Sequence, residues 1–276
     1  MGFQHSCADQ ALFTKSSSTS FTAILVYVDD LVLAGNNLCE IQIVKQALDH
    51  AYKIKDLGQF RFFLGLEVSI SKTGLLLNQR QYALSLLQDT GTLASKPYKT
   101  LFDPSTKLQL NRGSPLPDHS LYRRLVGRLI YLTISRPDLS YAIQQLSLYM
   151  ESPHDTHYQA TIRVLHYIKS SPSLGLFFSS TSNLNLSAFA DSDWGCCIDT
   201  RRSAIYLAHN PVFHECTKHI EIDCHVVREK IHQGLVKLLP VSSSEQLVDA
   251  FTKPLPTKHF QIFVSKLGLH DLHLPP

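Results

Sequence analysis

Two adjacent aspartates, Asp29 and Asp30, are the residues of this sequence best placed to do chemistry. The segment 21–35 reads FTAILVYVDDLVLAG, a strand–turn–strand pattern with both carboxylates at its tip. Carboxylates fixed in this way can hold Mg²⁺, and nucleotide transfer uses two such cations against a primer end and a triphosphate. An isolated Asp-Asp pair is more often a surface turn. Here both flanking runs are too apolar to be exposed, which favours a site beside a core.

Hydrophobic spacing predicts the elements that must position this tip. Apolar residues recur at helical spacing over 38–52 and 79–88, and 60–70 is strand-like. Four prolines mark 96–117 as a loop or linker. A helical block follows, with apolar faces predicted over 121–132, 137–150 and 153–169. Two strands are expected within 174–193, and the pattern after Trp194 assigns no clear elements.

Composition bounds the class of protein without identifying it. The 276 residues suffice for one large domain or two ordinary ones, and 44% hydrophobic residues allow packed cores. A net charge of +3 permits nucleic-acid binding but does not argue for it. Neither a signal peptide nor a membrane span is predicted, because Asp29 and Asp30 interrupt the longest apolar stretch. The six scattered cysteines are expected to be reduced, and cytosol or nucleus is only the default location.

The string Tyr27-Val28-Asp29-Asp30 resembles the catalytic motif of reverse transcriptases. Its context, LVYVDDLVLAG, resembles the form found in copia-type retrotransposon Pol polyproteins. Further segments resemble that family in the family's order, at 54–69, 121–143, 188–203, 210–230 and 246–255. The resemblance implies an α+β fold in three regions. These are a partial reverse-transcriptase palm over 1–75, thumb and connection helices over 76–173, and a truncated ribonuclease H-like region over 174–276.

The resemblance also implies roles for particular residues. Asp29 and Asp30 would be catalytic metal ligands for Mg²⁺, and Tyr27 would lie near an RNA/DNA template-primer. The strand segment Leu64, Gly65 and Leu66 would belong to the primer grip.

In the ribonuclease H-like region the resemblance assigns Asp191 as the first catalytic metal ligand and Asp249 as the last. Asp193 is a close alternative to Asp191.

The departures from the family predict a loss of activity. A third palm aspartate and the fingers should precede the hairpin, but only 28 residues come before Asp29, and Asp9 is no candidate. In the ribonuclease H-like region, Ser203 runs directly into Ala204 where the family has a long intervening segment with two more carboxylates. We therefore expect a non-catalytic remnant, at most a weak nucleic-acid-binding fragment. A complementable polymerase piece and an incomplete gene model of an active polymerase are the alternatives.

Two further clusters have a structural and a functional interpretation. A dense set of His and Cys side chains could bind zinc, but its spacing is not a standard finger pattern, so the structural interpretation is favoured. These residues are His214, Cys216, His219, Cys224 and His225. Five arginines of the helical block could track a phosphate backbone, or could form a solvated helix face. They are Arg123, Arg124, Arg128, Arg136 and Arg163.

Overall fold

The computed structural model divides the chain into two compact units, Met1–Ser69 and Ile70–Pro276, and each is described by itself. The structure describes residues 2–7, 9–102, 108–110, 112–183, 230, 233–235, 239, 241–242, 245–252 and 255–271. Within these residues the elements are a mixture of helices and strands, which confirms the mixed α and β fold expected from the sequence.

The first unit is built on a four-stranded antiparallel sheet in which neighbours in sequence are neighbours in space. Its strands are β1 (Gln4–His5), β2 (Leu12–Ser16), β3 (Phe21–Tyr27) and β4 (Asp30–Gly35). Every connection is therefore a hairpin, and the register pairs Leu12 with Leu25 and Tyr27 with Asp30. The predicted strand–turn–strand around the aspartates is confirmed.

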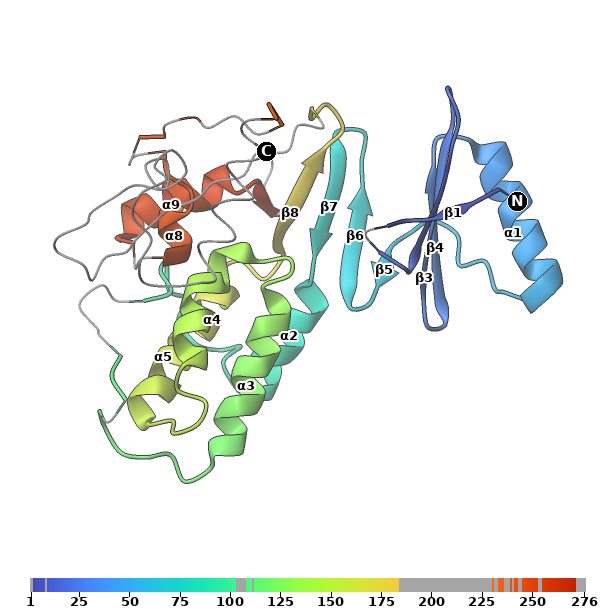
Figure 1. The fold of residues 1–276 in the computed structure, drawn as a ribbon. Coiled ribbons are helices and arrows are strands. Elements are labelled where there is room, and N and C mark those ends of the chain that lie inside the picture. The colour runs from blue at the N-terminus through green and yellow to red at the C-terminus, as the bar shows by residue number, and fades with distance from the viewer. Residues whose placement is uncertain are drawn as a thin grey trace. The chain divides into compact units, whose positions relative to one another are not determined.

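Helix α1 (Leu38–Tyr52) lies alongside β4 (Figure 1). Asn37 caps its start by accepting a hydrogen bond from the Glu40 backbone N–H. The Glu40 carboxylate contacts two strands of the sheet. It forms an ion pair with Lys15 of β2 at 2.6 Å and accepts a hydrogen bond from the Thr22 hydroxyl of β3 at 3.0 Å. These contacts, with the buried Val44, fix the helix on the sheet.

The segment that the sequence marks as strand-like over 60–70 is a hairpin of two short strands, β5 (Phe62–Phe63) and β6 (Leu66–Ile70). The chain reverses at Leu64 and Gly65, which have φ of 50° and 75°. Periodicity missed the turn because Leu64 carries no turn signal, and only Gly65 favours this conformation.

The second unit contains strands β7 (Gly74–Asn78), β8 (Leu174–Ser179) and β9 (Leu269–Asp271), and β8 pairs antiparallel with both of the others. Gly175 allows β7 and β8 to approach closely, since a Cβ there would collide with the Leu77 carbonyl oxygen. This pairing joins positions almost a hundred residues apart in the sequence, and β9 adds the C-terminal end of the described chain.

In the part of the second unit that the structure describes, the helices enclose a hydrophobic core. They are α2 (Arg80–Asp89), α3 (His119–Leu132), the 3₁₀ turn η1 (Pro137–Leu139), α4 (Ser140–Ser147), α5 (Asp155–Ser170), α8 (Asp249–Thr252) and α9 (Thr257–Lys266). The three helices predicted for 121–169 are confirmed, with η1 and α4 together filling 137–147. Ala250, Phe260 and Phe263 from α8 and α9 belong to the same buried cluster as α3, α4 and α5. Among the described residues, no helix has the length and apolar character needed to cross a bilayer.

Candidate functional site

The tip of the β3–β4 hairpin consists of two residues, Val28 and Asp29, closed by the Tyr27–Asp30 pair. Val28 has φ of 49°, whereas Asp29 is not among the positive-φ residues, which is the sign pattern of a type II′ turn. Asp29 lies in the loop and Asp30 opens β4, so the strands hold both carboxylates at one exposed end of the sheet.

Val28 is a strained residue at this tip. A β-branched side chain rarely adopts positive φ, and residues held in such regions cost about 1–3 kcal/mol each. Its side chain is 84% exposed, so packing of that side chain does not offset the strain. The surrounding hairpin must therefore impose the conformation.

The β5–β6 hairpin, which contains the predicted primer-grip residues, contacts the first hairpin. Its loop is Leu64–Gly65, closed by the Phe63–Leu66 pair. The Phe63 ring meets the Tyr27 ring edge to face, with centroids 6.4 Å apart and planes at 76°. The structure thus brings Tyr27 and the Asp29–Asp30 tip together with this second loop, as Figure 1 shows for β3, β4 and β5.

Sequence reasoning missed Phe63. The signal was the aromatic density of the segment FRFF, which a buried strand explains equally well.

The described residues do not supply the ligands for two cations. They contain no group of three or more His, Cys, Asp or Glu side chains arranged to hold a metal ion. Asp29 and Asp30 could contribute to one Mg²⁺ that also binds substrate phosphates and water. A pair of ions needs further carboxylates, so the described residues do not fit a two-ion site.

The predicted ribonuclease H residues do not form a site within the described chain. Asp249 is the first residue of the four-residue helix α8 in the second unit. Asp191 and Asp193 lie outside the described residues, as do His214, Cys216, His219, Cys224 and His225 of the possible zinc cluster.

Four of the five arginines proposed as phosphate ligands are used inside the fold. The Arg123 Nε donates to the Met150 carbonyl oxygen at 2.8 Å, and Arg128 pairs with Asp89 at 2.7 Å. Arg163 donates to the Thr100 hydroxyl and lies over the Tyr98 ring, 4.6 Å from its centroid. These side chains hold helices and loops together. Neither a free phosphate track nor a simple solvated face describes them.

Arg136, the fourth, is buried in an ion pair with Asp138. Its Nε and Nη2 donate to the two Asp138 oxygens at 2.9 and 2.8 Å, and its Nη1 donates to the Ser171 carbonyl oxygen. The Tyr167 hydroxyl donates to Asp138 at 2.8 Å. Burial is the largest single effect on Arg136 and by itself lowers its pKa, but the charge and hydrogen bonds of Asp138 and Tyr167 together raise that pKa.

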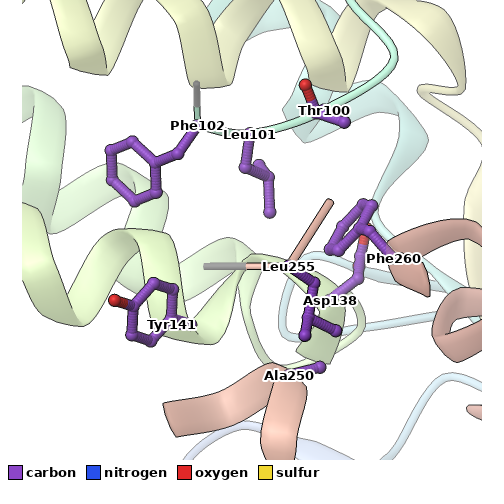
Figure 2. Close-up of a pocket in the computed structure, with 8 residues that line it drawn as sticks. All are labelled: Thr100, Leu101, Phe102, Asp138, Tyr141, Ala250, Leu255 and Phe260. Carbon is purple, nitrogen blue, oxygen red and sulfur yellow. The ribbon is translucent and has the colours of Figure 1, made fainter. Parts of the chain in front are cut away.

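A small pocket of the second unit borders this ion pair (Figure 2). Residues 100–102 form one side, and Tyr141, Leu255 and Phe260 lie around Asp138. Both oxygens of Asp138 already accept hydrogen bonds from Arg136 or Tyr167, so the pocket offers mainly apolar surface.

Comparison with known proteins agrees with the hairpin geometry. Residues 1–102 match the family model described as reverse transcriptase (RNA-dependent DNA polymerase). The retrovirus-related Pol polyprotein from transposon RE2 of Arabidopsis thaliana is 33% identical over all of this chain and 24% of its own length. The uncharacterized mitochondrial protein AtMg00810 of the same plant is 38% identical, covering 65% of this chain and 75% of itself.

A third relative comes from yeast. The putative transposon Ty5-1 protein YCL074W of Saccharomyces cerevisiae is 31% identical, covering 74% of this chain and 67% of its own length. No solved structure matches the chain.

An apolar hairpin with an Asp-Asp tip and the family match define the class of the N-terminal part as a reverse transcriptase segment. The chain belongs to the Pol polyproteins of copia-type retrotransposons. It spans about a quarter of the length of the RE2 polyprotein.

Proposed function

We propose that this chain is a remnant of a retrotransposon RNA-directed DNA polymerase that binds nucleic acid but does not add nucleotides by itself. The observation that carries this proposal is the Asp29–Asp30 tip, with two carboxylates and no third metal ligand beside them in the described part of the chain. The proposed ligand is an RNA/DNA template-primer, held at the two loops of the first unit.

The chemistry explains why binding and catalysis separate here. Nucleotide addition requires charge stabilisation by two cations at the attacking and leaving oxygens, which a partial carboxylate set does not provide. When bound, Mg²⁺ would supply that stabilisation. Binding requires only surface contacts, and the exposed Tyr27 and Val28 lie at the same tip. In this proposal, 1–75 is a partial palm and 76–173 corresponds to thumb and connection helices.

The ribonuclease H-like region over 174–276 is proposed to be inactive as well. The alignment with RE2 extends over 344 residues, whereas this chain has 276, so RE2 contains residues in the aligned region without a counterpart here. The alignment with the Ty5-1 protein extends over 205 residues and covers 74% of this chain. That share of the chain is almost as long as the alignment, so the Ty5-1 protein has almost no extra residues in the aligned region. A deletion confined to one part of the chain, as expected at Ser203–Ala204, accounts for both alignments. Asp191 and Asp249 would then remain from a larger carboxylate set.

The second candidate is a polymerase piece that works with segments supplied by another chain. The fraction of the RE2 polyprotein that this chain spans, about a quarter, is the observation that favours it. The two candidates differ in one measurable property, which is extension of a primer when the missing segments are provided.

Primer extension with Mg²⁺ on an RNA template tests the proposal directly. The chain and its Asp29→Asn/Asp30→Asn variant are compared at equal folded concentration, and template-primer binding is followed by fluorescence anisotropy at low salt. We expect no extension from either protein and measurable binding by both. Extension that the double substitution abolishes would overturn the inactive assignment, and no binding at low salt would overturn the assignment of a nucleic-acid ligand.

A further inference from the structure

The β3–β4 and β5–β6 hairpins carry an aromatic ring at the same position. Tyr27 directly precedes the loop Val28–Asp29, and Phe63 directly precedes the loop Leu64–Gly65. These two rings are the ones that meet, at 6.4 Å between centroids in an edge-to-face arrangement. The contact therefore joins the hairpins at the last residue before each loop.

Each loop carries backbone strain that its own side chains do not relieve. The first loop residue is Val28 in one hairpin and Leu64 in the other, with φ of 49° and 50°. Conformations of this kind persist only where the surrounding structure over-determines them. Val28 is 84% exposed, so packing of its own side chain does not provide that support.

The Phe63 ring is suited to that role because it is itself supported. The Phe60 ring packs against the Phe63 ring, with centroids 6.1 Å apart and planes at 58°. Tyr27 is half exposed, so its ring depends on few contacts, and Phe63 is its aromatic partner among the described residues. A row of three rings, Phe60–Phe63–Tyr27, thus leads from the second hairpin to the residue beside the aspartates.

We propose that Phe63 is a positioning residue for the Asp29–Asp30 tip. Its ring holds Tyr27, and through Tyr27 it fixes the loop that would meet a template-primer. The expected effect of Phe63 on template-primer binding rests on the proposed function, whereas its expected effect on the conformation of the Val28–Asp29 loop does not. An edge-to-face pair of this kind corresponds to about a two- to tenfold change in an equilibrium constant.

Residue-resolved hydrogen exchange measures the positioning without a ligand. The test compares Phe63→Leu, which removes the ring and keeps apolar volume, with Phe63→Tyr, which keeps the ring. Phe21→Leu is the matched control, since Phe21 lies at the opposite end of β3 from Tyr27. We expect amide exchange at Val28–Asp30 to rise about two- to tenfold in Phe63→Leu. Exchange in β2 should stay unchanged, and Phe63→Tyr should behave as the parent.

Any of three results would overturn the inference. One is unchanged exchange at the tip in Phe63→Leu. The others are equal acceleration throughout the sheet and no recovery in Phe63→Tyr, because either outcome indicates a general structural role.

Template-primer affinity at low salt gives the second readout. We expect Phe63→Leu to bind about two- to tenfold more weakly and Phe21→Leu to bind as the parent does. If the parent chain does not bind, the proposed function fails while the exchange measurement still decides the role of Phe63. If the parent binds and Phe63→Leu binds equally well, the positioning role in binding is wrong.

Discussion

At the scale of single residues, backbone strain and not electrostatics distinguishes the candidate site. Val28 and Leu64 occupy positive φ at two loop tips. Glycine or asparagine would occupy these positions more easily, since both tolerate the left-handed region. Strain of this kind is typical of functional loops, where the direction of a side chain matters more than the stability of the turn.

Relief of this strain should stabilise the first unit. We expect Val28→Asn to raise the free energy of unfolding of that unit by about 1 kcal/mol, because asparagine tolerates positive φ and the exposed Val28 side chain loses little packing. Urea denaturation followed by peptide-resolved hydrogen exchange gives the measurement. Thr19→Asn is the control, because Thr19 is also β-branched and exposed but does not have positive φ. Equal effects of the two substitutions would contradict the strain argument.

At the scale of elements, a buried ion pair ties η1 to α5. Arg136 and Asp138 flank Pro137 at the start of η1, and Tyr167 reaches them from α5. The Arg136 and Asp138 side chains are only 2% and 0% exposed. Burying two charges is favourable only where each is fully hydrogen-bonded, and here several donors and acceptors meet that condition.

Breaking this pair should cost far more than breaking an exposed one. We expect Asp138→Asn to lower the free energy of unfolding of the second unit by about 3–5 kcal/mol, because it leaves a buried guanidinium without a counter-charge. Asp89→Asn, which removes the exposed partner of Arg128, should cost at most about 1 kcal/mol. Chemical denaturation of both variants provides the comparison. Similar losses would show that the Arg136–Asp138 pair contributes little.

At the scale of the whole molecule, the two units differ in how they respond to acid. In the second unit, His157 stacks on Tyr149 at 3.9 Å, its Nδ1 accepts from the His154 backbone N–H, and its Nε2 faces the Gln109 carbonyl oxygen at 3.0 Å. The neutral ring satisfies both partners. Burial lowers the pKa of His157, with a further lowering by His154, against the opposing effects of Gln109 and Asp155.

A lowered histidine pKa makes the unfolded state the better proton acceptor. The stability that His157 contributes is therefore present above its ordinary pKa of 6.5 and is lost as the pH falls below that value. In the first unit, hydrogen bonds from Lys15 and Thr22 lower the pKa of Glu40, so that contribution is lost only as the pH falls below the ordinary value of 4.5.

We therefore expect the free energy of unfolding of the second unit to fall as the pH drops below about 6.5, while that of the first unit holds until the pH drops below about 4.5. Urea equilibration at each pH, followed by a hydrogen-exchange pulse, reports the two units separately. His157→Gln should flatten the pH dependence of the second unit, whereas His259→Gln, an exposed histidine on α9, should not. An unchanged slope in His157→Gln would exclude this residue as the cause.

The sequence by itself determined the family, the hairpin and most helices. The apolar runs on either side of Asp29 and Asp30 predict two strands joined by a short turn, and α1, α3 and α5 follow from apolar spacing. These features are local, so each is encoded within a short stretch. The capacity of Asp29 and Asp30 to bind a metal ion is also local, because it follows from the residue type alone.

Contacts between distant parts of the chain became clear only from the tertiary structure. It placed Phe63 against Tyr27, buried Arg136 in an ion pair, and joined α8, α9 and β9 to the helical core. None of these has a periodic signal, because each depends on residues far apart in the chain that exclude water together. Arg136 and Asp138 are neighbours in sequence, but their burial depends on the distant Tyr167 and Ser171. Five arginines across the helical block could therefore be interpreted as phosphate ligands until packing showed that four of them hold the protein together.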